Sequence, residues 1–330
     1  MEQYTSKDVP VIDVHGHYVS GTYRKVLEDT GRALEDSFPI PPWDVQMQLE
    51  VMDKLNIGAS IFSISSPDIC LSCTGDNGRS MSRLFNEEAA KYASDYPGKF
   101  GFFATVPMPD IDGTLKEIEY AFDVLHADGV KFYSNASGMY LGEPEMEPVF
   151  AELDRREAIF TLHPTKPSAV PAGCLKNVPI PPIEFQFDTT RAVANMIFNG
   201  VFERYRKIKF VCPHMATIIP LLAGRWVATA AVMEKFEHLK GFKAPDFMGI
   251  FKRFIYDCSG GFNLPVQIPA LLSLSSPDTW IFGTDFPFTP LPLVERFTTA
   301  FRETNLLTEE QKIDALHNNA TKLFPRFKKN

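Results

Sequence analysis

Two histidines in the segment VIDVHGHY are the side chains of this chain best suited to bind a metal ion. His15 and His17 are separated by one residue, so in a β-strand both side chains point to the same side, together with Asp13. Neutral imidazole nitrogens are common metal ligands. The pair alone is a weak indication, because a histidine in a strand is often only a hydrogen-bonded core residue.

Three further polar side chains stand at the ends of later apolar segments. His163 ends IFTLHP, His214 ends KFVCPH, and Asp285 lies near the end of WIFGTDFP. The other histidines fall in predicted helices. A set of four histidines and one carboxylate at the ends of four predicted strands is far more specific than the pair, so the sequence favours a metal site over a purely structural role.

The elements that must position these residues alternate along the whole chain. Eight apolar or β-branched runs predict strands at 11–18, 59–66, 101–109, 129–135, 159–164, 209–214, 254–260 and 280–287. Helical periodicity predicts helices at 44–56, 80–95, 112–127, 146–157, 189–205, 216–238, 265–273 and 308–324. This alternation is typical of an α/β protein with a (β/α)8 TIM barrel, in which catalytic residues lie at the carboxyl ends of the strands. We expect one domain over residues 1–330, with a C-terminal helical extension.

Histidine nitrogens and one carboxylate favour Zn²⁺, with Mn²⁺ and Fe²⁺ as alternatives, because these ions accept mixed nitrogen and oxygen ligands. Such a shell leaves one position open for water or substrate. The metal can then polarise a substrate oxygen or lower the pKa of a bound water to about 7.

Composition excludes several other classes of protein. Lys and Arg total 33 against 41 Asp and Glu, a net charge of −8 that disfavours binding to nucleic acid. No apolar run approaches the roughly 18 residues of a membrane span. The five cysteines have no spacing typical of a disulfide framework, and the Cys70–Cys73 pair lacks a second pair for structural zinc. We therefore expect a cytoplasmic enzyme that acts on a small molecule.

Taken together, the segments IDVHGH, FTLHP, FVCPH and FGTDFPF resemble the amidohydrolase superfamily. The resemblance is to its branch of nonoxidative decarboxylases related to aminocarboxymuconate semialdehyde decarboxylase. It spans essentially the whole chain and includes the segments 43–57, 140–156, 187–205, 214–225 and 318–324.

The resemblance implies a role for each site residue. His15, His17, His163 and Asp285 are similar to the ligands of a single divalent metal ion. His214 resembles the histidine that handles protons, and with Asp285 it is the candidate proton donor for the carbon that loses CO₂. Arg225 is similar to an arginine that reaches a substrate carboxylate across a subunit interface, which implies a homodimer.

Other positions narrow the expected substrate. Where the semialdehyde decarboxylase has arginines, this chain has Gln48 and Glu50, which favours an aromatic acid with one carboxyl group. Phe286 and Phe288, beside Asp285, are compatible with an aromatic pocket. The pattern is most similar to 6-methylsalicylate decarboxylases, which implies conversion of 6-methylsalicylate to 3-methylphenol and CO₂ in polyketide secondary metabolism.

Several alternatives remain open from the sequence. Lys131 could be carbamylated and bridge two metals, which would favour a hydrolase of a lactone or amide. A noncatalytic barrel is a third hypothesis, since fold alone does not fix function. The proline-rich stretch 164–182 is either a lid or an irregular connection, and Asp13 either orients an imidazole or belongs to a lower layer of the barrel. Met215 and Ala216 replace the two glycines that follow this histidine in many members of the superfamily.

Overall fold

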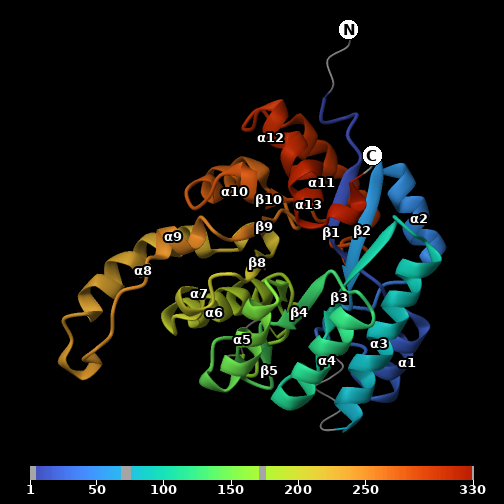
Figure 1. Cartoon of the computed structure of the whole chain (residues 1–330). Helices are drawn as coiled ribbons and strands as arrows, with labels where there is room; N and C mark the ends of the chain where they lie inside the picture. The colour runs from blue at the N-terminus through green and yellow to red at the C-terminus, as the bar shows by residue number, and fades with distance from the viewer. Residues whose placement is uncertain (1–4, 68–75, 171–175, 329–330) are drawn as a thin grey trace.

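The computed structural model describes residues 5–67, 76–170 and 176–328, and its centre is one sheet of eight parallel strands. The strands follow chain order: β1 (Val11–His17), β2 (Ile57–Ser63), β3 (Phe100–Thr105), β4 (Gly129–Tyr133), β7 (Ile159–His163), β8 (Lys209–Cys212), β9 (Ile255–Asp257) and β10 (Trp280–Ile281) (Figure 1). A parallel bridge between Asp13 and Phe282 brings the last strand against the first. The prediction of a (β/α)8 barrel is confirmed.

Helices separate the strands and surround the sheet. They are α1 (Gly21–Asp29), α2 (Val45–Lys54), α3 (Asp76–Asp95), α4 (Ile111–Asp123), α5 (Glu147–Arg155), α6 (Glu184–Phe198), α7 (Val201–Arg204), α8 (Ile219–Met233), α9 (Phe247–Phe251), α10 (Leu264–Leu272), α11 (Leu291–Glu303), α12 (Glu309–Ile313) and α13 (Asn319–Leu323). A short hairpin, β5 (Asn135–Ala136) and β6 (Met139–Tyr140), follows β4. In the described part of the chain, no helix is both long and apolar enough to cross a membrane.

The helices differ from the sequence predictions in a few places. The predicted helix 189–205 is two helices, because Gly200 adopts a left-handed φ of 69° between α6 and α7. The predicted helix 308–324 contains a π-helical turn at Asp314–Asn318. The sequence analysis missed α1, α9 and α11, and the predicted strand 280–287 is only two residues long as β10.

The C-terminal segment covers the amino ends of the strands. Phe324 and Phe327 pack in one apolar cluster with Ile12 and Phe103 from the barrel. His317 reaches the carbonyl of Pro10, just before β1, at 2.7 Å through its Nδ1. This end of the barrel is therefore filled by packed side chains, and the carboxyl ends of the strands remain for a site.

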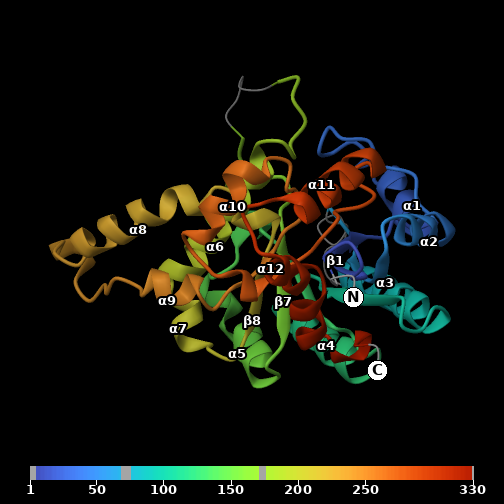
Figure 2. The same ribbon diagram turned by 90° about the horizontal axis from the view of Figure 1, so that it is seen from above.

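Helix α8 extends away from the barrel in both ribbon views (Figures 1 and 2). It carries three exposed apolar side chains: Leu221 is 77% exposed, Val227 41% and Val232 51%. Exposed apolar surface concentrated on one element marks a site of interaction with another molecule.

Candidate metal centre

Four side chains from four different strand ends converge at the carboxyl end of the barrel. One ligand atom from each of His15, His163, His214 and Asp285 lies within 4.8 Å of all the others. His17 lies against the same group, since its Nε2 is 3.0 Å from Oδ1 of Asp285. The structure thus brings together all five residues predicted from strand spacing, in an arrangement that can hold a divalent metal ion.

Three of the histidines are held in place through their Nδ1 atoms. Nδ1 of His15 hydrogen-bonds to Asp257, Nδ1 of His17 lies 3.2 Å from the carbonyl of Ser63, and Nδ1 of His163 lies 2.7 Å from the carbonyl of Pro164. Donation from Nδ1 fixes the tautomer and leaves Nε2 as an acceptor, the usual arrangement of a metal-binding histidine.

One buried nitrogen of the cluster fits a metal ligand. Nε2 of His15 makes no hydrogen bond within the described chain and lies 3.7 Å from Oδ1 of Asp285. Buried polar atoms normally find partners, so this nitrogen beside a carboxylate suits the binding of a cation. Nδ1 of His214 is also buried without a hydrogen bond among the described residues.

The backbone presents His214 and Asp285 in an unusual conformation. His214, Met215, Ala216 and Thr217 have φ values of 53°, 53°, 61° and 54°, and φ of Asp285 is 57°. Left-handed conformations cost energy for residues other than glycine and concentrate at functional sites. Met215 and Ala216 therefore adopt, after β8, a backbone conformation that glycine would adopt at lower cost.

Burial and charge act in opposite directions on the ionisable groups. Burial lowers the pKa of His15, but the carboxylates of Asp257 and Asp285 outweigh this and raise it to about 9. Burial, and then the charge of His15, lowers the pKa of His214 to about 4. Burial raises the pKa of Asp285, but the hydrogen bond from His17 and the charge of His15 bring it down to about 2. The carboxyl group of Asp285 is thus held in its ionised form, the form that binds a cation.

Asp257 is the residue of this centre that the sequence analysis missed. It ends β9, it is fully buried, and it contacts the imidazole of His15. The signal was present, because Asp257 is the one acidic residue in the apolar run FIYDCSG. Asp13 does not take this role: Oδ1 accepts from the backbone N–H of His15, and both oxygens accept from Thr284. It holds β1 against the segment before Asp285.

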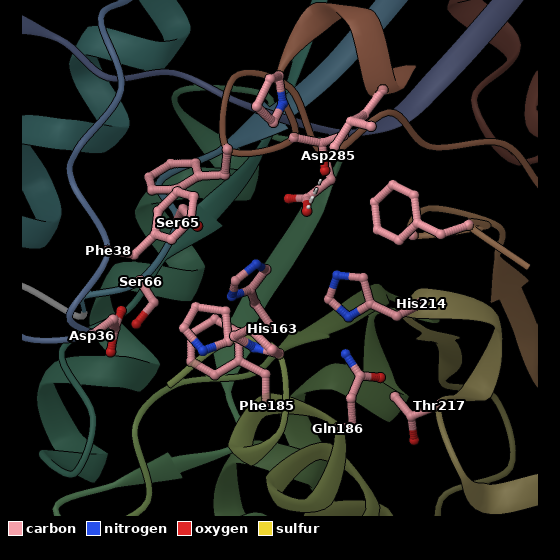
Figure 3. Close-up of a pocket in the computed structure, with 18 of the residues that line it drawn as sticks. Asp36, Phe38, Ser65, Ser66, His163, Phe185, Gln186, His214, Thr217 and Asp285 are labelled. Atoms are coloured by element: carbon pink, nitrogen blue, oxygen red, sulfur yellow. Dashed lines mark hydrogen bonds between the residues drawn. The ribbon is translucent and has the colours of Figure 1, made fainter. Parts of the chain in front are cut away.

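A pocket of about 610 Å³ opens onto the metal-binding residues (Figure 3). His163, His214 and Asp285 line it together with Phe185 and Phe288. The ring of Phe288 also meets that of His17 edge to face, with centroids 5.5 Å apart. The size of the pocket and its mixture of aromatic and polar walls suit a small aromatic ligand.

Phe286 corrects an expectation about this pocket. Its side chain is 5% exposed and belongs to the main core, and it is absent from the pocket wall. Its carbonyl accepts a hydrogen bond from the backbone N–H of His17 at 2.8 Å. Phe286 therefore supports the site from behind, and Phe288 alone of the two lies against the pocket.

The profile of the amidohydrolase family matches residues 12–326, nearly the whole chain. This chain belongs to the amidohydrolase family. The family assignment made from the sequence motifs is thereby confirmed.

Among characterised amidohydrolase relatives, 6-methylsalicylic acid decarboxylase of Aspergillus aculeatus is 30% identical over 323 residues, covering 96% of this chain and 97% of the relative. The solved structure of an amidohydrolase II is 30% identical, with a TM-score of 0.87, and covers 96% of this chain and 99% of that one. A 5-carboxyvanillate decarboxylase of Novosphingobium aromaticivorans, solved with manganese, has the same fold at 20% identity, with a TM-score of 0.82 and 96% of each chain covered.

Three predicted residues of this amidohydrolase lie away from its pocket. Arg225 is exposed on α8, and no Arg or Lys is among the described residues that line the pocket. Gln48 is buried and accepts a hydrogen bond from the indole of Trp43 at 3.0 Å. Glu50 is exposed on α2. A ligand in this pocket therefore meets no Arg or Lys side chain among the described residues of the protomer.

Lys131 is buried on β4, where its Nζ donates to the carbonyl of Ile64 at 2.6 Å and lies 3.5 Å from the centre of the Tyr133 ring. These contacts suit an ammonium group.

Two other predictions fall partly or wholly outside the described residues. Cys70 and Cys73 lie outside them. In the stretch 164–182, residues 171–175 lie outside them, while Pro181 and Pro182 line the pocket.

Proposed function

We propose that this amidohydrolase is a nonoxidative, metal-dependent decarboxylase of hydroxybenzoate-type aromatic acids. The observation that carries the proposal is the anchored histidine cluster at the mouth of an aromatic pocket, in a chain that is 30% identical over 96% of its length to a 6-methylsalicylic acid decarboxylase. The specific substrate that we propose first is 6-methylsalicylate, which would yield 3-methylphenol and CO₂ in polyketide secondary metabolism.

The way the histidines are anchored supports a division of roles. His15, His17 and His163 each have a hydrogen-bonded Nδ1, so their Nε2 atoms are fixed as ligands, and Asp285 supplies the fourth ligand atom. His214 lacks such an anchor among the described residues. We therefore assign His15, His17, His163 and Asp285 to the metal and leave His214 to handle protons.

The reaction needs a proton at the carbon that bears the carboxylate. Once this carbon is protonated, its bond to the carboxyl carbon breaks, CO₂ leaves, and the electron pair restores the aromatic ring. His214 lines the pocket, and its Nδ1 makes no hydrogen bond to any described residue, so its imidazole is placed to carry this proton. Asp285 is the second candidate because it also lines the pocket.

The metal, when bound, supplies positive charge that draws the carboxylate and the adjacent phenol oxygen of the substrate to the site. Three nitrogens and one oxygen fit Zn²⁺ best, with Mn²⁺ as the alternative. We propose one ion per chain, because Lys131 has the contacts of an ammonium group. The runner-up function, hydrolysis of a lactone or amide with two metals and a carbamylated Lys131, has no comparable support.

We further propose that the protein acts as a homodimer and that Arg225 binds the carboxylate of a substrate in the partner's pocket. The pocket wall of the described protomer contains no Arg or Lys, Arg225 is exposed on the protruding α8, and the same helix carries the uncovered Leu221 and Val227. A second copy would bury this apolar surface. The single domain and the cytoplasmic location expected from the sequence stay predictions.

A panel of hydroxybenzoates tests the proposed function. Metal-loaded protein is incubated with salicylate, 6-methylsalicylate and dihydroxybenzoates, and CO₂ and the phenol product are measured. Equimolar release of both from at least one acid, abolished by a chelator and restored by Zn²⁺ or Mn²⁺, is the expected result. Absence of turnover on the whole panel together with hydrolysis of lactones would overturn the proposal.

A further inference from the structure

One side of the pocket carries a buried carboxylate for which the proposed reaction has no use. Asp36 lies in the connection between α1 and α2 and lines the same pocket as His163 and Asp285. The residue is only 5% exposed, and its Oδ1 makes no hydrogen bond to any described residue. Leaving a buried acceptor without a donor is costly, so the pocket is built for a ligand that supplies that donor.

Two buried hydroxyl groups stand beside this carboxylate. Oγ of Ser66 lies 3.0 Å from Oγ1 of Thr165, and a side-chain hydrogen bond from Ser66 also acts on the carboxyl group of Asp36. Both hydroxyl-bearing residues are 3% exposed. Figure 3 shows Asp36 next to Ser66, with His163 between them and His214. Asp36 and Ser66 form a polar corner of the pocket, and Thr165 hydrogen-bonds to Ser66.

The polar corner shares one pocket with the metal-binding residues. Asp36 and Ser66 line the same pocket as His163 and Asp285, and the partner of Ser66, Thr165, follows His163 by two residues. Phe38, Pro181 and Phe185 supply apolar walls to the same pocket. A ring held by its carboxylate at the metal can therefore extend towards Asp36.

A backbone hydrogen bond holds Asp36 in position, and few charged groups lie near its carboxyl group. Its carbonyl accepts a hydrogen bond from the N–H of Ile180 at 2.9 Å, which ties this connection to the rim of the pocket. The charged groups that face its carboxyl group are Glu35, Arg32 and Lys166. Arg32 forms a salt bridge with Glu35. Burial outweighs the hydrogen bond from Ser66 and the charge of Lys166, and it raises the pKa of Asp36 to about 6.

We propose that Asp36 is a specificity-determining residue that accepts a hydrogen bond from a hydroxyl substituent on the substrate ring, at a position remote from the reacting carboxyl group. The inference rests on the proposed function and refines its substrate class: hydroxybenzoates with a second hydroxyl or a hydroxymethyl group at ring position 4 or 5 should be better substrates than 6-methylsalicylate, which has no donor for Oδ1. A methyl group there would leave Oδ1 without a donor. A second carboxylate there would be repelled by Asp36.

Paired substrates that differ only in this substituent test the inference on the metal-loaded enzyme. We compare kcat/KM for 2,4-dihydroxybenzoate with that for 2-hydroxy-4-methylbenzoate, and repeat the comparison for the 5-substituted pair. For at least one position the hydroxyl compound should be preferred by roughly ten- to a hundredfold, the range for a hydrogen bond to a charged acceptor. Equal values, or preference for methyl at both positions, would refute the proposal.

Substitution of Asp36 assigns the preference to this residue. Asp36→Ala should bring the ratio of the two kcat/KM values close to one, and Asp36→Asn, which keeps an acceptor, should retain part of the preference. The matched control is Asp128→Asn, since Asp128 is also buried but accepts from the backbone of Phe102 outside the pocket. An undiminished ratio in Asp36→Ala would overturn the assignment.

A binding measurement separates failure of this inference from failure of the proposed function. Calorimetry with the product phenols compares resorcinol with 3-methylphenol on the same proteins and does not depend on turnover. If no benzoate reacts, the proposed reaction is wrong, and the Asp36-dependent preference for resorcinol still decides the role of Asp36. If benzoates react but neither kinetics nor binding favours the hydroxyl compound, the reaction stands and the role of Asp36 is refuted.

Discussion

Replacement of Asp36 by Asn should stabilise the protein, and should do so more at high pH than at low pH. The pKa of this carboxyl group rises on folding from 3.8 to about 6, mainly through burial. Because the folded pKa is the higher one, the folded state holds its proton more tightly, and stability is lost as the pH rises through this window. At 1.36 kcal/mol per pKa unit, ionised Asp36 lowers the free energy of unfolding by about 3 kcal/mol well above pH 6.

The size of the effect can be worked out for accessible conditions. With these two pKa values, Asp36 lowers the free energy of unfolding by about 1.6 kcal/mol at pH 5 and by about 3 kcal/mol at pH 8, a change of about 1.4 kcal/mol. An unfolding entropy of about 2.1 cal/mol/K per residue over 330 residues gives roughly 0.7 kcal/mol/K. The Tm advantage of Asp36→Asn should therefore grow by about 2 °C between pH 5 and pH 8.

Thermal unfolding of both proteins in the same buffers measures this difference, and effects that they share, such as protonation of the metal ligands, cancel. Asp53→Asn controls for the loss of one negative charge at the surface, since that side chain is 80% exposed. A Tm difference that stays constant with pH, or that shrinks as the pH rises, would show that Asp36 is not held as an uncompensated carboxylate.

The remaining predictions concern the metal centre and the subunit interface. Asp257→Asn should weaken metal affinity by about ten- to a hundredfold in a chelator competition, because it removes the anion that orients His15; unchanged affinity would contradict this role. His214→Ala should retain the metal but lower kcat by about 10²–10⁴, and loss of the metal would place His214 among the ligands instead. Lys131→Ala should bind one metal per chain, as the original protein does, and a fall from two to one would support the binuclear alternative. When Arg225→Ala protein is mixed with Asp285→Ala protein, each hybrid dimer has one pocket with an intact Asp285 and an intact Arg225 from the other subunit, so activity should be restored. Inactive hybrids would argue against a shared site.

The sequence predicted which strand-end side chains come together, because that signal is geometric. A strand places every second side chain on one side, and the carboxyl ends of barrel strands meet, so His15, His163, His214 and Asp285 converge in an eight-stranded barrel. The division of these residues between metal and proton transfer stays a prediction. The last strand was predicted too long, yet Asp285 still reaches the site. The backbone N–H of Asp285 donates a hydrogen bond to the carbonyl of His15 at 2.6 Å, although Asp285 lies beyond the end of the regular strand β10.

Other parts of the site depend on contacts that no local pattern carries. Asp36 lies in a connection without periodicity and reaches the pocket through a single backbone hydrogen bond to Ile180, far along the chain. Phe286 and Phe288 are equivalent in the sequence, and only the fold sends the first into the core and the second to the pocket. Helix α1 was missed because its nine residues bury only Tyr23 and Leu27, too short a stripe to give a clear period.

The most direct test of the central claim, protonation and loss of CO₂ at the metal centre, is the reaction run in D₂O with a substrate identified in the hydroxybenzoate panel. Mass spectrometry and NMR of the phenol should find one deuterium at the carbon that carried the carboxylate, formed only by metal-loaded protein and suppressed in His214→Ala. Phenol formed without deuterium at that carbon, or formed equally well by metal-free protein, would contradict the account.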